Sequence, residues 1–302
     1  MRTSIVLLLY LFCVGCFTRT VTAIEETDED VFYSLPQNNP IYLDTNGVTI
    51  KCLGTEIGTL FEVNGKEFEV VNEAQLRSKV ENDLDVSCVC TSNITNMSAL
   101  FENKGGFDQN ISSWDTAQVT DMYLMFKNAF LFNQDIGLWD TSSVLNMEQM
   151  FNGASSFNQP TGGWQTASAT TMSEMFHYAA VFNQNISQWD LTEVTDTSFM
   201  FAGATNFNQN IGTWNTANVT NMQSMFSAAA TFNQAIGNWN TENVTDMEAM
   251  FQLASAFDQD LTAWCVIQIT NEPTDFATDS SCLLYTSPSP RDLSTSRMPS
   301  SA

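Results

Sequence analysis

Pairs of amide or carboxylate side chains, two residues apart, recur along the chain on either side of a glutamine, as in Asp258-Gln259-Asp260. These groups donate or accept hydrogen bonds, so an exposed row of them could bind a sugar or a peptide. A solvated polar face is the competing interpretation. The candidate ligand-binding residues are Asp108, Asn110, Asn133, Asp135, Asn183, Asn185, Asn208, Asn210, Asp258 and Asp260.

The same acids do not predict a metal centre. Calcium takes about six to eight oxygen ligands from a defined loop, and no D-x-[DN]-x-[DN]-G motif occurs. The single histidine, His177, leaves little material for zinc ligation or proton relay. No G-x-S-x-G, H-E-x-x-H or glycine-rich phosphate loop accompanies the serines and threonines. We therefore expect no enzyme, no catalytic residue, no metal and no cofactor.

The charge balance restricts the partners. The 302 residues include 34 acidic and 10 basic side chains, a formal net charge of −24, which would repel nucleic acid. Residues 128–290 hold fifteen acids and no lysine or arginine. Solubility through net charge is the simpler explanation, and a basic partner or a high-salt habitat is the alternative. Apolar residues make up 43%, which argues against wholesale disorder.

A 25-residue period runs through most of the chain. It is kept by phenylalanines from Phe107 to Phe257, each followed two positions later by a glutamine, and by Met-Phe pairs from Met125-Phe126 onward. A fixed period in this range is typical of solenoids, in which each unit buries its apolar face only against its neighbours. The tryptophans keep the period without exception and are expected in the core: Trp114, Trp139, Trp164, Trp189, Trp214, Trp239 and Trp264.

Two shorter periodicities alternate within each unit. Residues 120–129 have apolar side chains at helical spacing after Thr120, and Thr220 with Gln223 and Thr245 with Glu248 fit capping boxes. Residues 132–136 alternate as a strand should. We therefore expect an α/β solenoid with one short strand and one short helix per repeat, the strands forming a parallel sheet opposite a layer of helices.

The repeat W-[DN]-T-x-x-V-T-x-M-x-x-M-F-x-x-A-x-x-F-N-Q-x-I resembles the BspA-like leucine-rich-repeat surface proteins, in the branch whose 25-residue repeat is a domain of unknown function. Seven units cover residues 89–263, and residues 264–282 resemble the closing repeat of that family. The resemblance implies a leucine-rich-repeat-like solenoid that is secreted or displayed at a cell surface, without catalysis and often proposed to serve adhesion. Thr197, Pro160 and Ala169 depart from the pattern.

The N-terminal residues 1–23 fit a secretory signal peptide. Arg2 precedes an apolar stretch, residues 5–17, and Val21-Thr22-Ala23 offers small residues for cleavage. A lipoprotein signal with Cys16 acylated is the alternative. No later segment is long and apolar enough for a transmembrane helix. A signal peptide over residues 1–23 predicts that the protein is secreted or displayed at the cell surface.

The segments that flank the repeats lack the period. Residues 24–88 are expected to form a small α+β cap, with hairpin turns at Asn46-Gly47 and Asn64-Gly65 and a helix over 72–84. Residues 264–282 are expected to close the other end. Residues 283–302, with a Ser-Pro-Ser-Pro run, resemble a read-through or adaptor-derived tail that is not native.

Cysteines and N-glycosylation sequons are two features that would be modified in the secretory pathway. Disulfides are the default for cysteines after cleavage, with Cys52 joined to Cys88 or Cys90 and Cys265 joined to Cys282. The connectivity itself is not fixed by the sequence. Six N-x-[ST] sequons are glycosylation candidates in a eukaryotic pathway: Asn93, Asn96, Asn110, Asn185, Asn218 and Asn243.

We expect a secreted or cell-surface binding and adhesion module whose partner is an unidentified protein or glycan. The first alternative is an ice- or mineral-surface binder, because threonines recur in register, although Leu191 interrupts them. These threonines are Thr116, Thr141, Thr166, Thr216 and Thr241. The second alternative is a structural surface-coat protein that assembles with itself.

Overall fold

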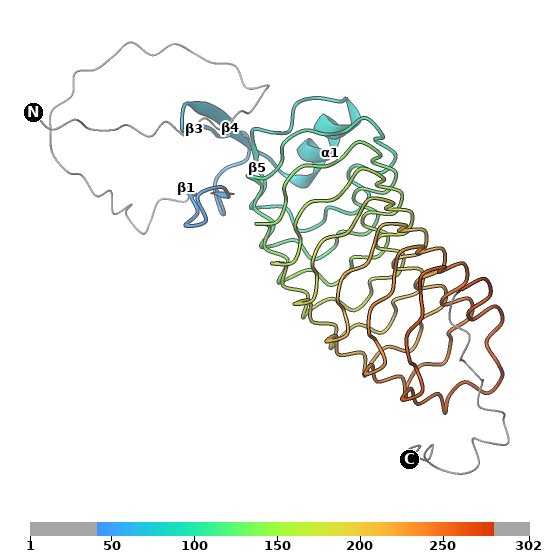
Figure 1. Ribbon diagram of the computed structural model, residues 1–302. Helices are drawn as coiled ribbons and strands as arrows, with labels where there is room; N and C mark the ends of the chain where they lie inside the picture. Colours follow the sequence, from blue (N-terminus) through green and yellow to red (C-terminus); the bar gives the residue numbers. More distant parts are fainter. Residues whose placement is uncertain (1–40, 281–302) are drawn as a thin grey trace, which may run out of the picture.

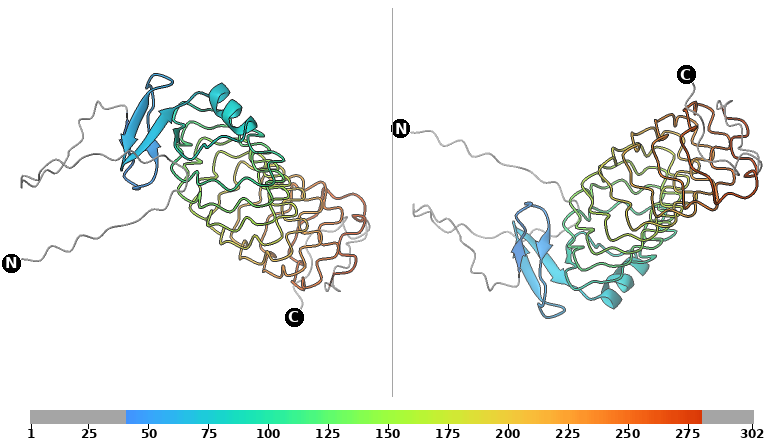
Figure 2. Two further views of the ribbon diagram at one scale, coloured as in Figure 1. Left: turned by 90° about the horizontal axis from the view of Figure 1, so that it is seen from above. Right: turned by 90° about the horizontal axis from the view of Figure 1, so that it is seen from below.

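The computed structural model describes residues 41–280, which form a small N-terminal cap followed by a long stack of coils (Figure 1). Each coil is one 25-residue repeat, and the stack runs away from the cap in a single direction, as the two further views show (Figure 2). The predicted repeat solenoid is therefore confirmed. Within 41–280 no helix is long and apolar enough to cross a membrane.

Every named helix and strand of the described chain lies between Tyr42 and Cys90, in the cap and at its junction with the first coil. Strands β1 (Tyr42–Leu43) and β2 (Ile50–Lys51) pair antiparallel, as do β3 (Leu60–Val63) and β4 (Lys66–Val70), and β5 (Val89–Cys90) pairs parallel with β4. Both predicted hairpins are present. The β3–β4 turn works because Asn64 and Gly65 adopt left-handed φ values of 52° and 75°, as a two-residue hairpin turn requires.

The predicted cap helix is also present, though shorter. Helix α1 spans Glu73–Glu81, and Asn72 caps it in a reciprocal capping box with Gln75. The helix ends because Asn82 leaves helical geometry and Asp83 takes a left-handed φ of 53°. The two buried side chains of α1, Leu76 and Val80, join the core of the solenoid.

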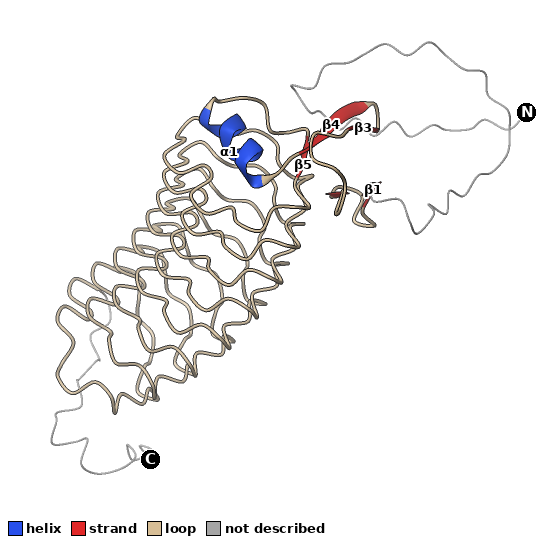
Figure 3. Cartoon of the chain, turned by 180° about the vertical axis from the view of Figure 1, so that it is seen from behind, coloured by secondary structure: helices blue, strands red, loops and turns tan. Residues whose placement is uncertain are grey.

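The predicted helix in each repeat is wrong. Figure 3 shows the described coils as loops and turns beside the single helix of the cap. In residues 120–129 the N–H groups of Met122, Leu124 and Phe126 donate to carbonyls 24 residues later, in the next coil. A helix would direct these N–H groups back into the same segment, so bonding between coils replaces helical bonding.

Tight turns in these segments depend on left-handed residues. Leu124 and Asn128 have φ of 58° and 57°, and the same two positions are left-handed in the other coils. Gly203 occupies one of them, and a Cβ there would lie 2.5 Å from the ring of Tyr178 in the preceding coil. The predicted capping boxes are wrong for the same reason, because the hydroxyl of Thr220 donates to the carbonyl of Thr195 instead.

The predicted strand over residues 132–136 is wrong as well. The parallel pairing between coils lies at residues 120–121, as isolated bridges such as Asn96 with Asp121, continuing in steps of 25 residues to Asp246. Val119 and Met122 point into the core on either side of Thr120, which is exposed. A sheet-like face therefore exists, but it follows the V-T-[DN] segment of the repeat.

The aromatic core is as predicted. All seven tryptophans are buried, with relative exposures of 0–6%. Each indole N–H donates to a backbone carbonyl 28 residues earlier, at 2.9–3.2 Å. The rings of Trp164 and Trp189 are parallel at 6.2 Å, and Phe126 stacks on Phe132 at 4.0 Å. The tryptophans thus join coils both by packing and by a buried hydrogen bond.

Arg77 of α1 completes the N-terminal end of the stack. Its guanidinium donates to the carbonyls of Ser98 and Asn96, at 2.8 and 3.4 Å. In the later coils the equivalent carbonyls accept N–H groups from the preceding coil. Since nothing precedes the first coil except the cap, Arg77 supplies the donors that a further coil would provide.

Candidate functional site

The first member of each predicted ligand pair belongs to a ladder of amides that joins the coils. The side-chain oxygen of Asn133 accepts the backbone N–H of Asn158 and the Nε2 of Gln159, both at 3.0 Å. The backbone N–H part of this contact recurs at 2.9–3.0 Å from Asp108 to Asp258. We call these contacts the amide ladder. Its members are Asp108, Asn133, Asn158, Asn183, Asn208, Asn233 and Asp258.

The second member of each pair shapes a local turn. The side-chain oxygens of Asn110, Asp135, Asn185, Asn210 and Asp260 each accept the N–H two residues later, at 2.9–3.1 Å. The hydroxyl and N–H of Thr262 also lower the pKa of Asp260. These oxygens therefore have structural partners, although most of these side chains remain exposed. Their predicted role in ligand binding stays a prediction.

The threonines that suggested a lattice-binding surface are buried. Thr116, Thr141, Thr166, Thr216 and Thr241 have relative exposures of 0–3%. Their hydroxyls donate to backbone carbonyls 24 residues later, at 2.8–3.0 Å. This column cannot contact ice or a mineral, because its polar atoms are used within the stack.

A second column of threonines is exposed, and it is not among the candidate residues predicted from the sequence. It stands on the parallel ladder, where the hydroxyls donate to carbonyls 25 residues earlier at 3.0–3.4 Å. The alternation of apolar Val119 with polar Thr120 is the signal for this column in the sequence, but a helix N-cap at Thr120 fits the same residues. We call this column the threonine face: Thr95, Thr120, Leu145, Thr170, Thr195, Thr220 and Thr245.

The column beside the threonine face is mostly polar and uncharged. It runs through Gln118, Ser143, Ser168, Glu193, Asn218 and Asn243. The side-chain nitrogens of Asn218 and Asn243 donate to the carbonyls of Thr192 and Ala217, at 2.7 and 2.8 Å. These two sequons therefore place Asn and Thr side by side on this surface. A glycan at either site would cover the threonine face.

The remaining sequons lie in different settings. The side-chain oxygen of Asn93 accepts the N–H of Gly54, and its nitrogen is buried without a partner. Asn96 accepts the N–H of Ser98 and a guanidinium N–H of Arg77. Asn185 is exposed, and Asn110 is half-buried. Access to the side-chain nitrogen thus differs sharply among the six candidates.

His177 lies in a polar cluster on the turn side of the coils. Its Nδ1 is 3.3 Å from a carboxylate oxygen of Glu174 and 3.4 Å from the side-chain nitrogen of Asn152. Burial lowers the pKa of His177, and the hydrogen bond to Glu174 opposes this. Burial and the charges of Glu174 and Asp196 raise the pKa of Glu148 nearby. No described serine, threonine or cysteine hydroxyl or thiol is hydrogen-bonded to His177.

The cysteines resolve the alternatives left open by the sequence. Cys52 pairs with Cys90, which ties β2 to β5. Cys265 carries an exposed free thiol, contrary to the disulfide expected for it, and Cys282 lies outside the described residues. Across 41–280, no group of three or more His, Cys, Asp or Glu side chains is arranged to hold a metal ion.

Two cavities flank the junction between the cap and the coils. One, of about 510 Å³, lies between the β1–β2 turn and the first coils. At its wall Lys51 is 2.7 Å from Asp115. Burial lowers the pKa of Lys51, but the hydrogen bond and charge of Asp115 outweigh it and raise the pKa overall. The other cavity, of about 700 Å³, lies between the end of α1 and the first coil.

Comparison with known families places the repeat. The model of a family described as "Mycoplasma protein of unknown function, DUF285" matches residues 71–189 and 170–283. Comparisons with curated proteins and with solved structures found no match. The two matches together extend from the cap helix through every coil, with the 25-residue spacing seen in the tryptophans. On this evidence, the chain belongs to the DUF285 family.

Proposed function

We propose that this protein is a secreted or cell-surface binding and adhesion module without catalytic activity, and that the threonine face is its recognition surface. The observation that carries this proposal is the exposed column from Thr95 to Thr245, which stands on a continuous parallel backbone ladder. Sheet-lined faces of solenoids commonly serve recognition. The Cys52–Cys90 disulfide supports an oxidising compartment.

The rigidity of the threonine face supports this role. The five hydroxyls of Thr120, Thr170, Thr195, Thr220 and Thr245 each donate to the preceding coil, and the backbone beneath is bonded to both neighbours. A surface whose rotamers are already fixed loses little conformational entropy on binding. The face is also long, since seven positions at about 4.8 Å per coil extend over about 29 Å.

Two other repeated sets of polar groups are less suited to recognition than the threonine face, because they are hydrogen-bonded within the stack. The amide ladder and the buried threonines direct their oxygens toward neighbouring coils. The threonine face itself carries no charge, whereas Glu193 lies in the column on one side of it and Asp121, Asp196 and Asp246 lie in the column on the other side. A row of uncharged hydroxyl groups suits an uncharged hydrogen-bonding partner such as a glycan, or a neutral patch of a protein.

A lattice binder is the second candidate, and the same column favours it. Thr170, Thr195, Thr220 and Thr245 form four consecutive identical positions at regular spacing. A regular row of methyl and hydroxyl groups suits an ordered surface such as ice. Thermal hysteresis of a cooled solution tests this candidate directly, and its absence would remove it.

The test of the main proposal is a binding screen of the full chain, secreted by a host that does not add N-glycans. Glycans and extracellular matrix proteins are immobilised and probed. One variant carries Thr195→Tyr and Thr220→Tyr, which place bulk on the threonine face. A matched variant carries Asn185→Tyr and Asn210→Tyr, at exposed positions beside the amide ladder.

Binding that is lost with the threonine pair and kept with the asparagine pair supports the proposal. Loss only with the asparagine pair would instead assign the binding site to the row of residues that contains Asn185 and Asn210. Equal binding by both variants, or no binding by the parent protein, would count against a recognition role for the threonine face. Circular dichroism melts of both variants confirm that the coils remain folded.

A further inference from the structure

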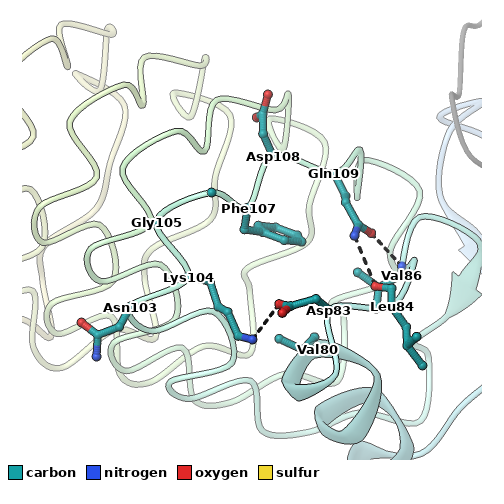
Figure 4. A pocket seen from close by; sticks show the side chains of 11 residues that line it. Val80, Asp83, Leu84, Val86, Asn103, Lys104, Gly105, Phe107, Asp108 and Gln109 are labelled. Carbon is teal, nitrogen blue, oxygen red and sulfur yellow. Dashed lines mark hydrogen bonds and ion pairs between the residues drawn. The ribbon is translucent and has the colours of Figure 1, made fainter.

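The cavity between α1 and the first coil, here called the cap cavity, is lined by both apolar and polar side chains (Figure 4). Val80, Leu84 and Phe107 contribute apolar surface, and Lys104 and Asp108 contribute polar groups. Its volume of about 700 Å³ falls within the range of small-molecule sites. The cap cavity is separate from the threonine face and does not depend on the function proposed above.

The cap cavity exists because the first coil departs from the repeat. Lys104 stands where the next six coils place a fully buried alanine, from Ala129 to Ala254. Gly105 and Gly106 stand where the next coil has Phe130 and Leu131. An ideal Cβ on Gly106 would meet no atom within 4 Å. Larger side chains could occupy this space, so the cavity arises from the sequence of this coil and not from the repeat.

Residues 83–86 occupy the position that a preceding coil would occupy and make some of the same hydrogen bonds. The carbonyl of Val86 accepts the indole N–H of Trp114 at 3.0 Å, as an isoleucine carbonyl does in five of the six later coils. The side chain of Gln109 bonds to the N–H of Val86 and the carbonyl of Leu84. Asp83 lies 25 residues before Asp108, so it occupies the register of the amide ladder.

The amide ladder is nevertheless broken at this point. The carboxylate of Asp83 lies 2.8 Å from the Nζ of Lys104, and the backbone N–H of Asp108 donates to no described residue. In the six later coils the equivalent N–H donates to a side-chain oxygen of the preceding coil. The cap cavity therefore has a free N–H donor where an amide oxygen is bound elsewhere in the stack.

This free donor defines the chemistry of an occupant. It requires an oxygen acceptor, and in five of the six later coils that acceptor is a carboxamide. An anion is disfavoured by the net charge of −24 and by Asp83 and Asp108 in the cavity lining. A cation would leave the N–H unpaired. The apolar side chains suit a methyl or methylene group next to the oxygen.

We propose that the cap cavity binds the acetamido group of an uncharged ligand. The carbonyl oxygen accepts the N–H of Asp108, and the methyl or methylene carbon packs against Val80, Leu84 and Phe107. An N-acetylated sugar and an asparagine side chain of a peptide both carry this group. The common chemistry is the neutral acetamido unit, and the two sources are separated by experiment.

The test is a titration of the ¹⁵N-labelled full chain followed by NMR. N-acetylglucosamine and N-acetyl-asparagine amide are the acetamido probes, and glucose and glucosamine are the controls. At least one acetamido probe is expected to shift the amide signal of Asp108 in a saturable way, while glucose and glucosamine leave it unchanged. The probe that binds more tightly identifies the source.

Two variants and one control locate the site. Lys104→Ala restores the repeat and frees Asp83 for the N–H of Asp108, so binding should weaken at least tenfold. Gly106→Leu fills the cavity and should have the same effect. Lys127→Ala, in the next coil, should bind as the parent does. Glucose binding as well as N-acetylglucosamine, unchanged affinity in both cavity variants, or no saturable shift with either acetamido probe would overturn the proposal.

Discussion

The side-chain oxygen of Asn183 accepts the backbone N–H of Asn208 at 3.0 Å, across the boundary between two coils. The same oxygen accepts the Nε2 of Gln209 at 2.9 Å. One side chain thereby satisfies two donors of the following coil. The residues first considered as ligands are thus also the residues that bond the stack together.

Removal of this acceptor should weaken the stack. Asn183→Ala leaves the N–H of Asn208 and the amide of Gln209 without their partner, and should lower the free energy of unfolding by about 1–3 kcal/mol. Asn183→Asp keeps an oxygen in the same place and should cost less. Urea denaturation of the two variants measures the difference. Equal losses of unfolding free energy in the two variants would show that the side-chain oxygen of residue 183 does not account for the stabilisation.

The buried threonines allow a matched comparison. The hydroxyl of Thr161 is buried without a hydrogen-bond partner, whereas that of Thr216 donates to the carbonyl of Asn240 at 2.9 Å. Thr161→Val removes an unsatisfied group and should stabilise the protein by up to about 1 kcal/mol. Thr216→Val should destabilise it by about 1 kcal/mol. Thermal melts that move in the same direction for both would contradict this account.

The tryptophan hydrogen bond can be separated from tryptophan packing. Trp214→Phe keeps most of the aromatic packing but leaves the carbonyl of Ile186 without its indole donor. The expected loss is about 1–3 kcal/mol, against about 3–5 kcal/mol for Trp214→Ala. Chemical denaturation measures both. If the phenylalanine variant matches the parent protein, the indole N–H contributes nothing to stability.

The disulfide should stabilise the cap more than the coils. Cys52 and Cys90 are separated by 38 residues, and a loop of that length is stabilised by about 2–4 kcal/mol. The variant with Cys52→Ala and Cys90→Ala should lose hydrogen-exchange protection in β1–β4 first. Cys265→Ser, which removes an exposed free thiol, should leave protection unchanged. Uniform loss across cap and coils would show that the two parts unfold together.

His177 should make stability depend on pH. Burial lowers its pKa below the ordinary 6.5, while Glu174 opposes the shift and Lys127 adds to it. The unfolded chain therefore takes up a proton first, so the stabilisation is complete above pH 6.5 and falls as the pH drops through that value.

The measurement is the change in melting temperature between about pH 7.5 and about pH 5.5, where histidine titrates. The parent protein should lose more than the His177→Gln variant over this interval. Because the chain has a single histidine, the variant removes the whole contribution of that residue type. An identical pH dependence would mean that His177 has the same pKa in the folded and unfolded chain.

The core was predictable from the sequence, and the backbone of the coils was not. Trp164 and Trp189 are buried and stacked because a fixed period places identical side chains above one another. The helix over 120–129 failed because apolar side chains three or four residues apart also fit a coil that turns around a core. Periodicity reports which side chains are buried, but not whether an N–H bonds within its segment or to the next coil.

For the candidate surfaces, too, the sequence predicts part of the arrangement and only the structure defines the rest. Thr120 is exposed with a hydroxyl bonded to a neighbouring carbonyl, and a helix cap would have produced the same sequence. The 25-residue period shows that Lys104 stands where later repeats have alanine, but it does not show the free N–H of Asp108. That N–H depends on the direction of the Asp83 side chain, which only the structure defines.

The direction of the hydrogen bonds between coils also determines how the molecule would respond to a pulling force. These bonds run along the stack, so tension between its two ends loads one boundary between coils after another. Each coil that peels away would turn a rise of about 4.8 Å into an extended segment of about 80–90 Å. A stack of this kind would lengthen in steps under load and would absorb mechanical work at each boundary between coils that opens.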